Sequence, residues 1–154
     1  MSAGKPMPQR GFTLTELLVT LMIAAIMAIM AVPAFSGFFA RQQLASDVNE
    51  IISVLSFARS EAIKQQQDIE VNVTQNNVWA IEVMKGAETI RLAEGSSTQI
   101  TVSANTAFSF DSLGTAKNDC KCSFILAHGN NNIVSKNITI SSAGGVRREA
   151  LDND

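Results

Sequence analysis

The sequence has few of the residues from which catalytic centres are usually built. Its 154 residues include one histidine, no tyrosine and one tryptophan. The single histidine, His128, precedes Gly129, and no nucleophile and base accompany it in a recognisable order. Phosphate-binding glycine loops and paired catalytic carboxylates are also missing from the sequence. We therefore expect a protein that is not an enzyme and that needs no cofactor.

Cysteine is almost as scarce, because only Cys120 and Cys122 are present. Two thiols outside a reducing compartment are normally oxidised, but a bond between residues two apart closes too small a loop to stabilise much. A metal site would need two further ligands, and His128 is the only histidine available. We therefore expect no metal site, and either a locally oxidised redox pair or free thiols on a loop.

Polar residues are nearly absent from one long stretch near the N-terminus. Between Leu17 and Phe35 the only polar side chain is Thr20. As a helix this stretch would extend about 28 Å, which matches the hydrocarbon core of a bilayer. The preceding flank carries Lys5 and Arg10 without any acid, so that flank should remain in the cytoplasm. The pattern predicts a single-pass inner-membrane protein whose remaining residues lie on the periplasmic side.

Two other interpretations of the apolar stretch compete with a permanent span. Val32-Pro33-Ala34 offers small residues at a spacing like that of a secretory cleavage site, and a plain membrane anchor would explain the hydrophobicity. Glu16 argues against both, because an ionised carboxylate at the edge of an apolar run is costly unless it has a partner.

The residues around Glu16 carry a specific resemblance. Arg10-Gly11-Phe12-Thr13-Leu14-Thr15-Glu16 resembles the class III signal of type IV prepilins and type II secretion pseudopilins. The resemblance implies that a prepilin peptidase removes residues 1–11 by cutting between Gly11 and Phe12, and that Phe12 is then N-methylated. It also implies that Glu16 pairs with the Phe12 amine of an adjacent subunit during assembly. Pro33 falls where many pilins carry a helix-loosening proline.

Past Phe39 the pattern becomes amphipathic. Apolar residues recur at helical spacing without glycine or proline, which predicts that one helix continues from Phe12 to about Gln66, about 80 Å in all. We expect residues 12–39 to form the transmembrane and filament-core half and residues 40–154 to form a periplasmic globular domain. The stripe consists of Leu44, Val48, Ile51, Ile52, Leu55, Ala58, Ala62 and Ile63.

The rest of the chain alternates apolar and polar residues in short runs separated by turn residues. This pattern predicts an antiparallel β-sheet against which the amphipathic half of the helix packs, so the fold class is α+β. The candidate strands are Asp68–Thr74, Val78–Met84, Thr89–Ala93, Gln99–Ser103, Asn105–Gly114, Ser123–Ala127 and Lys136–Ser141.

Two segments in this region are similar to GspH/FimT-type domains. They are Phe110-Asp111-Ser112-Leu113-Gly114 and the strand that leads into Gly144-Gly145-Val146-Arg147-Arg148. This similarity implies a structural minor pilin of a type IV pilus that acts at the tip or in assembly initiation, with other major and minor pilins as partners. The alternatives are an H-type minor pseudopilin of a type II secretion system and a DNA-binding minor pilin for natural transformation.

The DNA alternative rests on the basic residues near the C-terminus. Some FimT-type pilins are thought to bind DNA through an arginine-rich C-terminal segment, which makes Arg147, Arg148 and Lys136 the candidates here. However, Glu149, Asp152 and Asp154 follow at once and would repel phosphate within the Debye length of about 8 Å. The net charge of −2 adds no general attraction. We therefore favour an exposed, self-neutralised tail over DNA binding.

Overall fold

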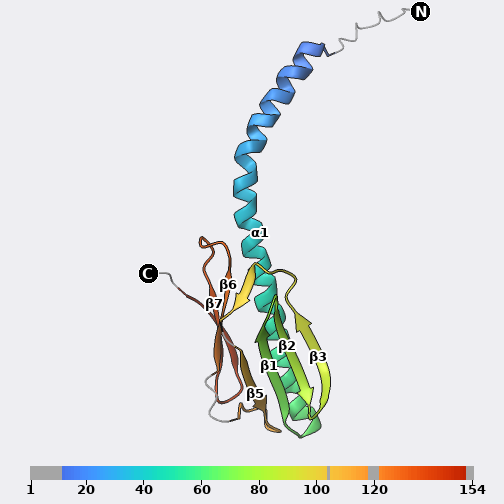
Figure 1. Ribbon diagram of the computed structural model, residues 1–154, viewed down its shortest axis with the longest axis vertical. Helices are drawn as coiled ribbons and strands as arrows, with labels where there is room; N and C mark the ends of the chain where they lie inside the picture. The colour runs from blue at the N-terminus through green and yellow to red at the C-terminus, as the bar shows by residue number, and fades with distance from the viewer. Residues whose placement is uncertain (1–11, 104, 118–121, 152–154) are drawn as a thin grey trace, which may run out of the picture. The chain divides into compact units, whose positions relative to one another are not determined.

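The computed structural model describes residues 12–103, 105–117 and 122–151, without the side chains of 30–34. The predicted leader, residues 1–11, lies outside this part of the chain. Residues 1–36 and 37–154 form two separate units. The elements are α1 (Leu14–Gln65), β1 (Ile69–Gln75), β2 (Trp79–Lys85), β3 (Glu88–Glu94), β4 (Ile100–Val102), β5 (Thr106–Phe110), β6 (Ser123–His128), β7 (Lys136–Ile140) and β8 (Val146–Ala150) (Figure 1).

In the N-terminal unit, the start of α1 is capped by Thr13. The Thr13 hydroxyl accepts a hydrogen bond from the Glu16 N–H at 3.3 Å, which satisfies one of the free donors of the first turn. Thr20, the polar residue within the apolar run, donates its hydroxyl to the Leu17 carbonyl at 2.8 Å. The large side chains around it are exposed: Phe12, Leu14, Leu17, Leu18, Val19, Leu21, Met22, Ile23, Ile26, Met27, Ile29 and Phe35. Within the residues described, no helix has the length and hydropathy needed to span a membrane.

The second unit contains two antiparallel sheets of four strands each. One has the order β3-β2-β1-β5 and the other the order β4-β6-β7-β8 (Figure 1). The alternation seen in the sequence directs one side of each strand inward, as in β1, where Ile69, Val71 and Val73 are buried. The α+β class, with a long N-terminal helix and antiparallel strands, is therefore confirmed, although the strands divide into two sheets.

The C-terminal half of α1 and the inner faces of both sheets share one hydrophobic core. Leu44, Val48, Ile51 and Leu55 are buried, as the stripe predicted. Each such side chain contributes about 1.5–3 kcal/mol to stability. Ala58 and Ala62 are buried as well, whereas Ile52 is only partly buried and Ile63 is 48% exposed. The largest buried side chains of the sheets are Trp79, Ile69, Ile81, Ile100, Phe110, Phe124, Leu126, Ile138 and Ile140.

Asp47 is buried within this core, although its sequence position predicted a side chain off the apolar stripe. The Trp79 indole N–H donates to its carboxylate at 2.6 Å, which joins α1 to β2. Gly95 lies directly against the indole ring, and a Cβ there would be only 2.6 Å from the Trp79 Nε1 atom. Desolvation raises the pKa of Asp47, and the indole hydrogen bond opposes that shift.

A second polar contact joins α1 to the loop before β8. The Arg59 guanidinium donates through Nη2 to the Ala143 carbonyl at 3.1 Å, while its Nε is buried without a partner. Gly114 and Gly144 meet beside it, both with positive φ. A Cβ on Gly144 would overlap the Gly114 carbonyl oxygen. Glycine is thus required at this position by both backbone conformation and space.

The strand β8 was not expected from the sequence. Residues Val146–Ala150 were predicted to be part of an exposed tail, but they pair with β7 along their whole length. The turn at Gly144 makes this pairing possible, because Ser141 N–H donates to the Gly145 carbonyl at 2.9 Å. The strand lacks strong alternation because four of its five residues are exposed, and only Val146 packs partly against the core.

We predict that Gly144→Ala lowers the free energy of unfolding by about 2–4 kcal/mol, because positive φ and overlap with Gly114 both oppose a side chain. Gly86→Ala is the matched control, since Gly86 also has positive φ but has open space around it. The control should lose only about 1 kcal/mol. Denaturant titration followed by the fluorescence of Trp79, the single tryptophan, measures both. Equal losses in the two variants would show that the glycine contact contributes nothing.

We predict that Asp47→Asn becomes progressively more stable than the natural protein as pH rises. A raised pKa means that the folded state binds the Asp47 proton more tightly than the unfolded chain does. The contribution of Asp47 is therefore greatest in acid and declines as pH rises through its folded-state pKa. The difference in thermal midpoint between variant and natural protein should increase from about pH 4 to about pH 7. If the difference in thermal midpoint stayed constant or fell over this range, the pKa of Asp47 would not be raised in the folded state.

Candidate functional site

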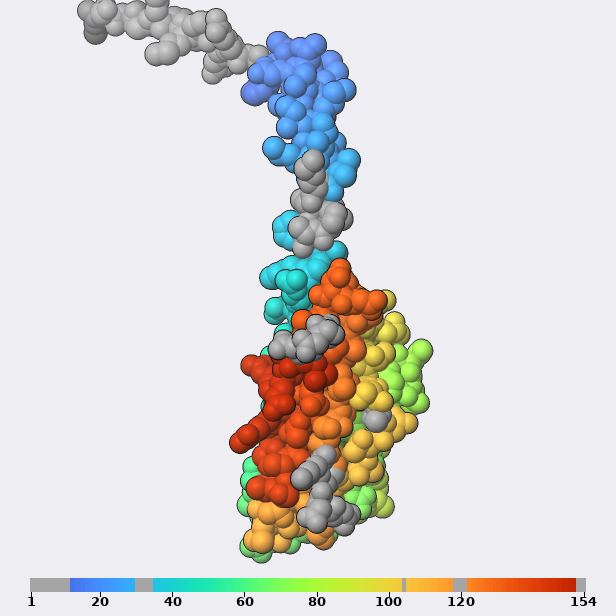
Figure 2. All heavy atoms as spheres, turned by 90° about the vertical axis from the view of Figure 1, so that its left-hand side faces the viewer, coloured from blue at the N-terminus to red at the C-terminus, as the bar shows by residue number. Residues whose placement is uncertain are grey.

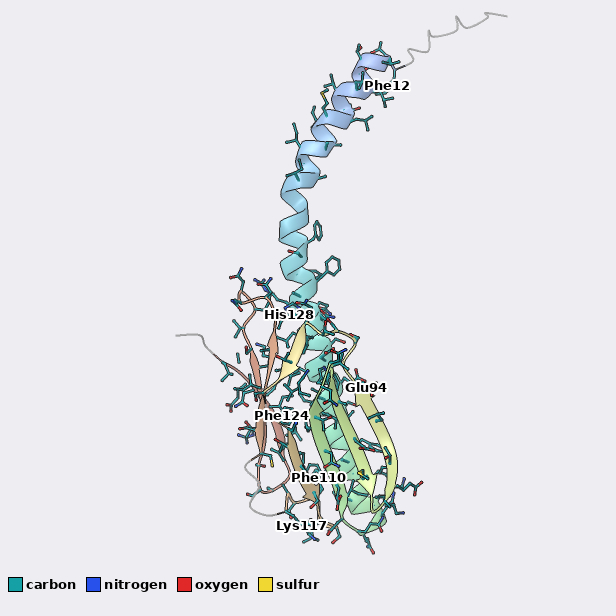
Figure 3. The ribbon with its side chains drawn as sticks, viewed as in Figure 1. Phe12, Glu94, Phe110, Lys117, Phe124 and His128 are labelled. Carbon is teal, nitrogen blue, oxygen red and sulfur yellow. The ribbon has the colours of Figure 1, made fainter. Side chains whose placement is uncertain are left out.

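The first candidate site is the N-terminal end of α1. Phe12 is 80% exposed and precedes the capping residue Thr13 (Figure 3). Glu16 lies within the first turn, where a carboxylate interacts favourably with the helix dipole. Two ion pairs occur among the described residues, Lys64–Glu61 and Lys117–Asp68, and Glu16 belongs to neither. Both side chains are therefore accessible at this end of the helix.

Thr13 is a helix-capping residue that the sequence interpretation missed. Thr13 and Glu16 have the spacing of a capping box, in which the hydroxyl of the first residue accepts from the backbone N–H of the second. This capping pattern is visible in the sequence, but the same residues were interpreted only as part of the processing motif. The cap keeps the first turn of α1 helical and so fixes the position of Glu16 relative to Phe12. Gly11, the other predicted processing residue, lies outside the described residues.

The second candidate site, the basic residues of the C-terminal segment, does not form one patch. In the β7–β8 ladder Arg148 is opposite Ile138, whose side chain is buried, and Arg147 is opposite Thr139. Because successive side chains in a strand point to opposite faces, Arg148 is directed toward the helix side and Arg147 toward the other face. Arg148 also donates to the Asn49 side chain of α1 at 3.0 Å.

Lys136 lies on the same face of the sheet as Arg148. It pairs with Ala150 across the ladder, and both basic side chains line a cavity of about 360 Å³ beside Ala45 and Val48 of α1. The structure therefore brings together two of the three predicted DNA-binding residues and separates Arg147 from them. The red strand β8 lies at the surface in Figure 2.

The cysteine segment is only partly described. Cys122 is buried directly before β6 and is disulfide-bonded, whereas Cys120 lies outside the described residues. His128 lies at the end of β6 (Figure 3), and its Nδ1 accepts the Asn130 N–H at 3.0 Å. In the described part of the chain, no three residues of the metal-binding types gather in one place.

The glycine-ended segment from Phe110 to Gly114 forms a tight turn after β5. Asp111 accepts hydrogen bonds from the Thr115 hydroxyl at 2.6 Å and from the backbone N–H groups of Leu113 and Thr115, each at 2.9 Å. The Thr115 bonds are the main reason that the pKa of Asp111 is lowered. This turn positions Gly114 against Gly144 and is structural in character.

Two family models match the sequence. The model described as type II transport protein GspH matches residues 47–144, which includes residues 47–65 of α1 and strands β1 to β7. The model described as the prokaryotic N-terminal methylation motif matches residues 6–32, which includes Phe12 and Glu16.

Relatives and solved structures agree with these matches. Two proteins of Pseudomonas aeruginosa named fimbrial protein are each 36% identical over 66 residues, which is 43% of this chain. The chain spans 42% of the length of these relatives. Two crystal structures of the type IV minor pilin FimU from Pseudomonas aeruginosa PAO1 have the same fold. The first superposes with a TM-score of 0.64 at 23% identity, over 75% of this chain and 98% of the chain in that crystal. The second superposes with a TM-score of 0.59 at 22% identity, over 71% of this chain and 98% of the chain in that crystal.

Each comparison supports the same assignment. The FimU structures share the arrangement of a long helix and antiparallel strands. The methylation motif accounts for the residues around Glu16. Because the GspH model extends over well more than half of the residues, this chain belongs to the type II transport protein GspH family of pilin-like proteins.

Proposed function

We propose that this protein is a structural minor pilin of a type IV pilus, which acts at the tip or in the initiation of assembly. The observation that carries the proposal is the exposed Phe12 and Glu16 at the start of α1, followed by apolar side chains that are exposed along the first unit. An apolar surface of this extent requires lipid or protein around it. Lipid before assembly and neighbouring pilin helices after assembly would supply it.

Processing by a prepilin peptidase is the first step of the proposal. Gly11 has no side chain, so the peptidase can approach the backbone between Gly11 and Phe12 closely. Cleavage leaves Phe12 as a new terminal amine four residues before Glu16. Residues 12–39 would then hold the protein in the inner membrane, with residues 40–154 in the periplasm.

Pairing of Glu16 with a neighbouring Phe12 amine is the second step. When a subunit moves from the bilayer into a helical bundle, its carboxylate loses whatever headgroup or water contact it had. A buried charge is costly unless it is paired, so the amine of an adjacent subunit favours one axial register over all others. The pairing would therefore select the register in which helices join the filament.

The type II secretion alternative shares every part of this proposal except the filament that the subunit joins. The GspH description favours secretion, whereas the fimbrial relatives favour a pilus. The fimbrial relatives match only part of their length, and FimU contributes the fold alone. We favour the pilus, and the filament fraction that contains the protein distinguishes the two.

DNA binding is the least favoured alternative. Phosphate recognition improves when basic side chains line a common surface, but Arg147 and Arg148 point to opposite faces of the same sheet. Arg148 is also engaged with Asn49, and Glu149 lies between Arg148 and the strand end. The two adjacent arginines of β8 therefore do not form a common basic surface for a duplex.

We predict that the mature protein begins at N-methylated Phe12 and that Gly11→Val blocks cleavage, because a branched side chain hinders access to the scissile bond. Mass spectrometry of the membrane-extracted protein determines the N-terminus. Gly37→Val is the control, since Gly37 has open space around it and lies away from the cleavage site. A mature protein that begins near Phe35 would favour a secretory signal peptide instead.

We predict that Glu16→Ala is inserted and cleaved normally but fails to enter filaments, with incorporation reduced about tenfold or more because the charge pair is lost. Glu50→Ala, which removes an exposed acid from the same helix, should be incorporated like the natural protein. Immunoblots of sheared pili, normalised to the membrane fraction, measure both. If Glu16→Ala is incorporated normally, the proposed charge pair is refuted. If the natural protein is found in a secretion pseudopilus and not in pili, the type II secretion alternative is favoured.

A further inference from the structure

Strand β8 forms an open edge of the second sheet. In the order β4-β6-β7-β8 it is the last strand, and the strands that the structure describes leave its outer side unpaired. An open edge presents backbone donors and acceptors that another extended chain can use, and proteins that do not use such an edge generally protect it. Val146–Ala150 contains neither a proline nor a bulge, so the charged side chains of Arg147, Arg148 and Glu149 are what protects this edge from indiscriminate pairing.

The register of β8 identifies which residues face outward. Ser141 N–H donates to the Gly145 carbonyl at 2.9 Å, and Leu151 N–H donates to the Ser135 carbonyl at 3.1 Å. Hydrogen-bonded pairs alternate along an antiparallel ladder, so the odd-numbered residues of β8 point their backbone groups toward β7. The backbone N–H and C=O groups of Val146, Arg148 and Ala150 therefore point to the open edge.

A groove runs beside this edge on the helix side. It consists of two adjoining cavities of about 330 Å³ and 360 Å³, which share Ala45 of α1 and Lys136 of β7 as lining residues. Its charged lining residues are Arg41, Lys136, Arg148 and Glu149. The single acid, Glu149, pairs with Asn137 in the ladder and so directs its side chain to the opposite face of the sheet from Arg148. The groove is therefore basic, although the whole chain has a net charge of −2.

We propose that the β8 edge and its groove bind an extended acidic segment of a neighbouring pilin-type subunit, which adds a strand beside β8. Backbone groups of Val146, Arg148 and Ala150 would hold the segment by strand addition. Arg41, Lys136 and Arg148 would select acidic side chains on it, since complementary charge provides specificity in such contacts. The inference rests on the proposed function, because a neighbouring subunit of this kind is present only in an assembly.

A protein strand fits these features better than the other candidates. Arg148 and Lys136 face a recess bordered by Ala45 and Val48, whereas phosphate backbones are bound by basic side chains on open surfaces. Unpaired backbone groups in a row are complementary to another polypeptide and carry no preference for DNA. A second copy of this chain could offer the acidic edge strand β3, and the experiment distinguishes that case.

The experiment uses the full-length protein in pili of its own host. The photoreactive residue p-benzoylphenylalanine replaces Ala150, whose side chain faces the groove side, and replaces Arg147 on the opposite face as the matched control. After irradiation, sheared pili are separated and cross-linked peptides are mapped by mass spectrometry. Ala45, an exposed helix residue that lines both cavities, is a second position if the Ala150 replacement disturbs the strand.

We expect the groove positions to cross-link to an acidic extended segment of another pilin subunit. Lys136→Glu or Arg148→Glu should reduce that product about tenfold, because like charges then face each other, whereas Arg147→Glu should change it less than twofold. Trp79 fluorescence confirms that each variant is folded. Exchange of the mapped acids for lysine should restore the product in the Lys136→Glu or Arg148→Glu background.

Each other outcome overturns the inference. Cross-links from Ala150 and Arg147 to the same segment would show that the groove has no special role. Mapping to Glu88–Glu94 of a second copy would replace the proposed partner with self-association, and cross-links to DNA would replace it with nucleic acid. If pili contain the protein but the groove forms no product, the inference fails while the proposed function stands. If pili do not contain the protein, the proposed function itself fails and the inference with it.

Discussion

The C-terminal half of α1 is the element on which the globular unit depends, because both sheets place their inner faces in one core with it. A sheet with one apolar face is not stable alone and must bury that face against another layer. Here a single helical stripe that includes Val48, Ile51 and Leu55 contributes to the core shared by the two sheets. A large-to-small change in that stripe therefore weakens both sheets together, which makes the unit cooperative despite its division into two sheets.

Polar contacts then fix how each sheet meets the helix. Asp47 binds the Trp79 indole in the first sheet, and Arg59 binds the loop that leads into β8 of the second. Hydrophobic burial is not directional, whereas a buried polar group must find its partner at a defined distance. The two contacts thus restrict sliding of either sheet along the helix. The close approach of Gly114 and Gly144 beside Arg59 serves the same end, since a larger side chain at Gly144 would push the two loops apart.

The sequence predicted most elements of this fold because their periodicity is strong. The helical stripe from Leu44 to Leu55 and the alternation in β1 each leave a clear pattern. What the sequence could not reveal depends on tertiary contact. From the sequence alone, Asp47 has the position of a solvent-exposed acid, and only the tertiary hydrogen bond from Trp79 explains its burial. Strand β8 shows no apolar alternation because it is an exposed edge strand. The Arg147-Arg148 pair resembled a single basic site only while the segment was taken to be a tail, since strand geometry sends adjacent side chains to opposite faces.

In the proposed function, the two units would contribute differently to assembly. The N-terminal helix would provide a contact common to all pilin-like subunits, and the globular unit would provide a contact specific to particular partners. If the exposed apolar residues from Leu14 to Ile29 pack in a filament as proposed, their burial would be strongly favourable but little selective, because many helices of similar pattern could pack against them. In the proposed function, Glu16 would set the axial register without distinguishing one subunit from another, since each pilin-like subunit with a free terminal amine could pair with it. Selection among subunits must then come from surfaces that differ between them, such as sheet edges and the charges beside them. An open edge lined by Arg41, Lys136 and Arg148 supplies directional hydrogen bonds and a preferred charge sign, which helix packing alone does not offer.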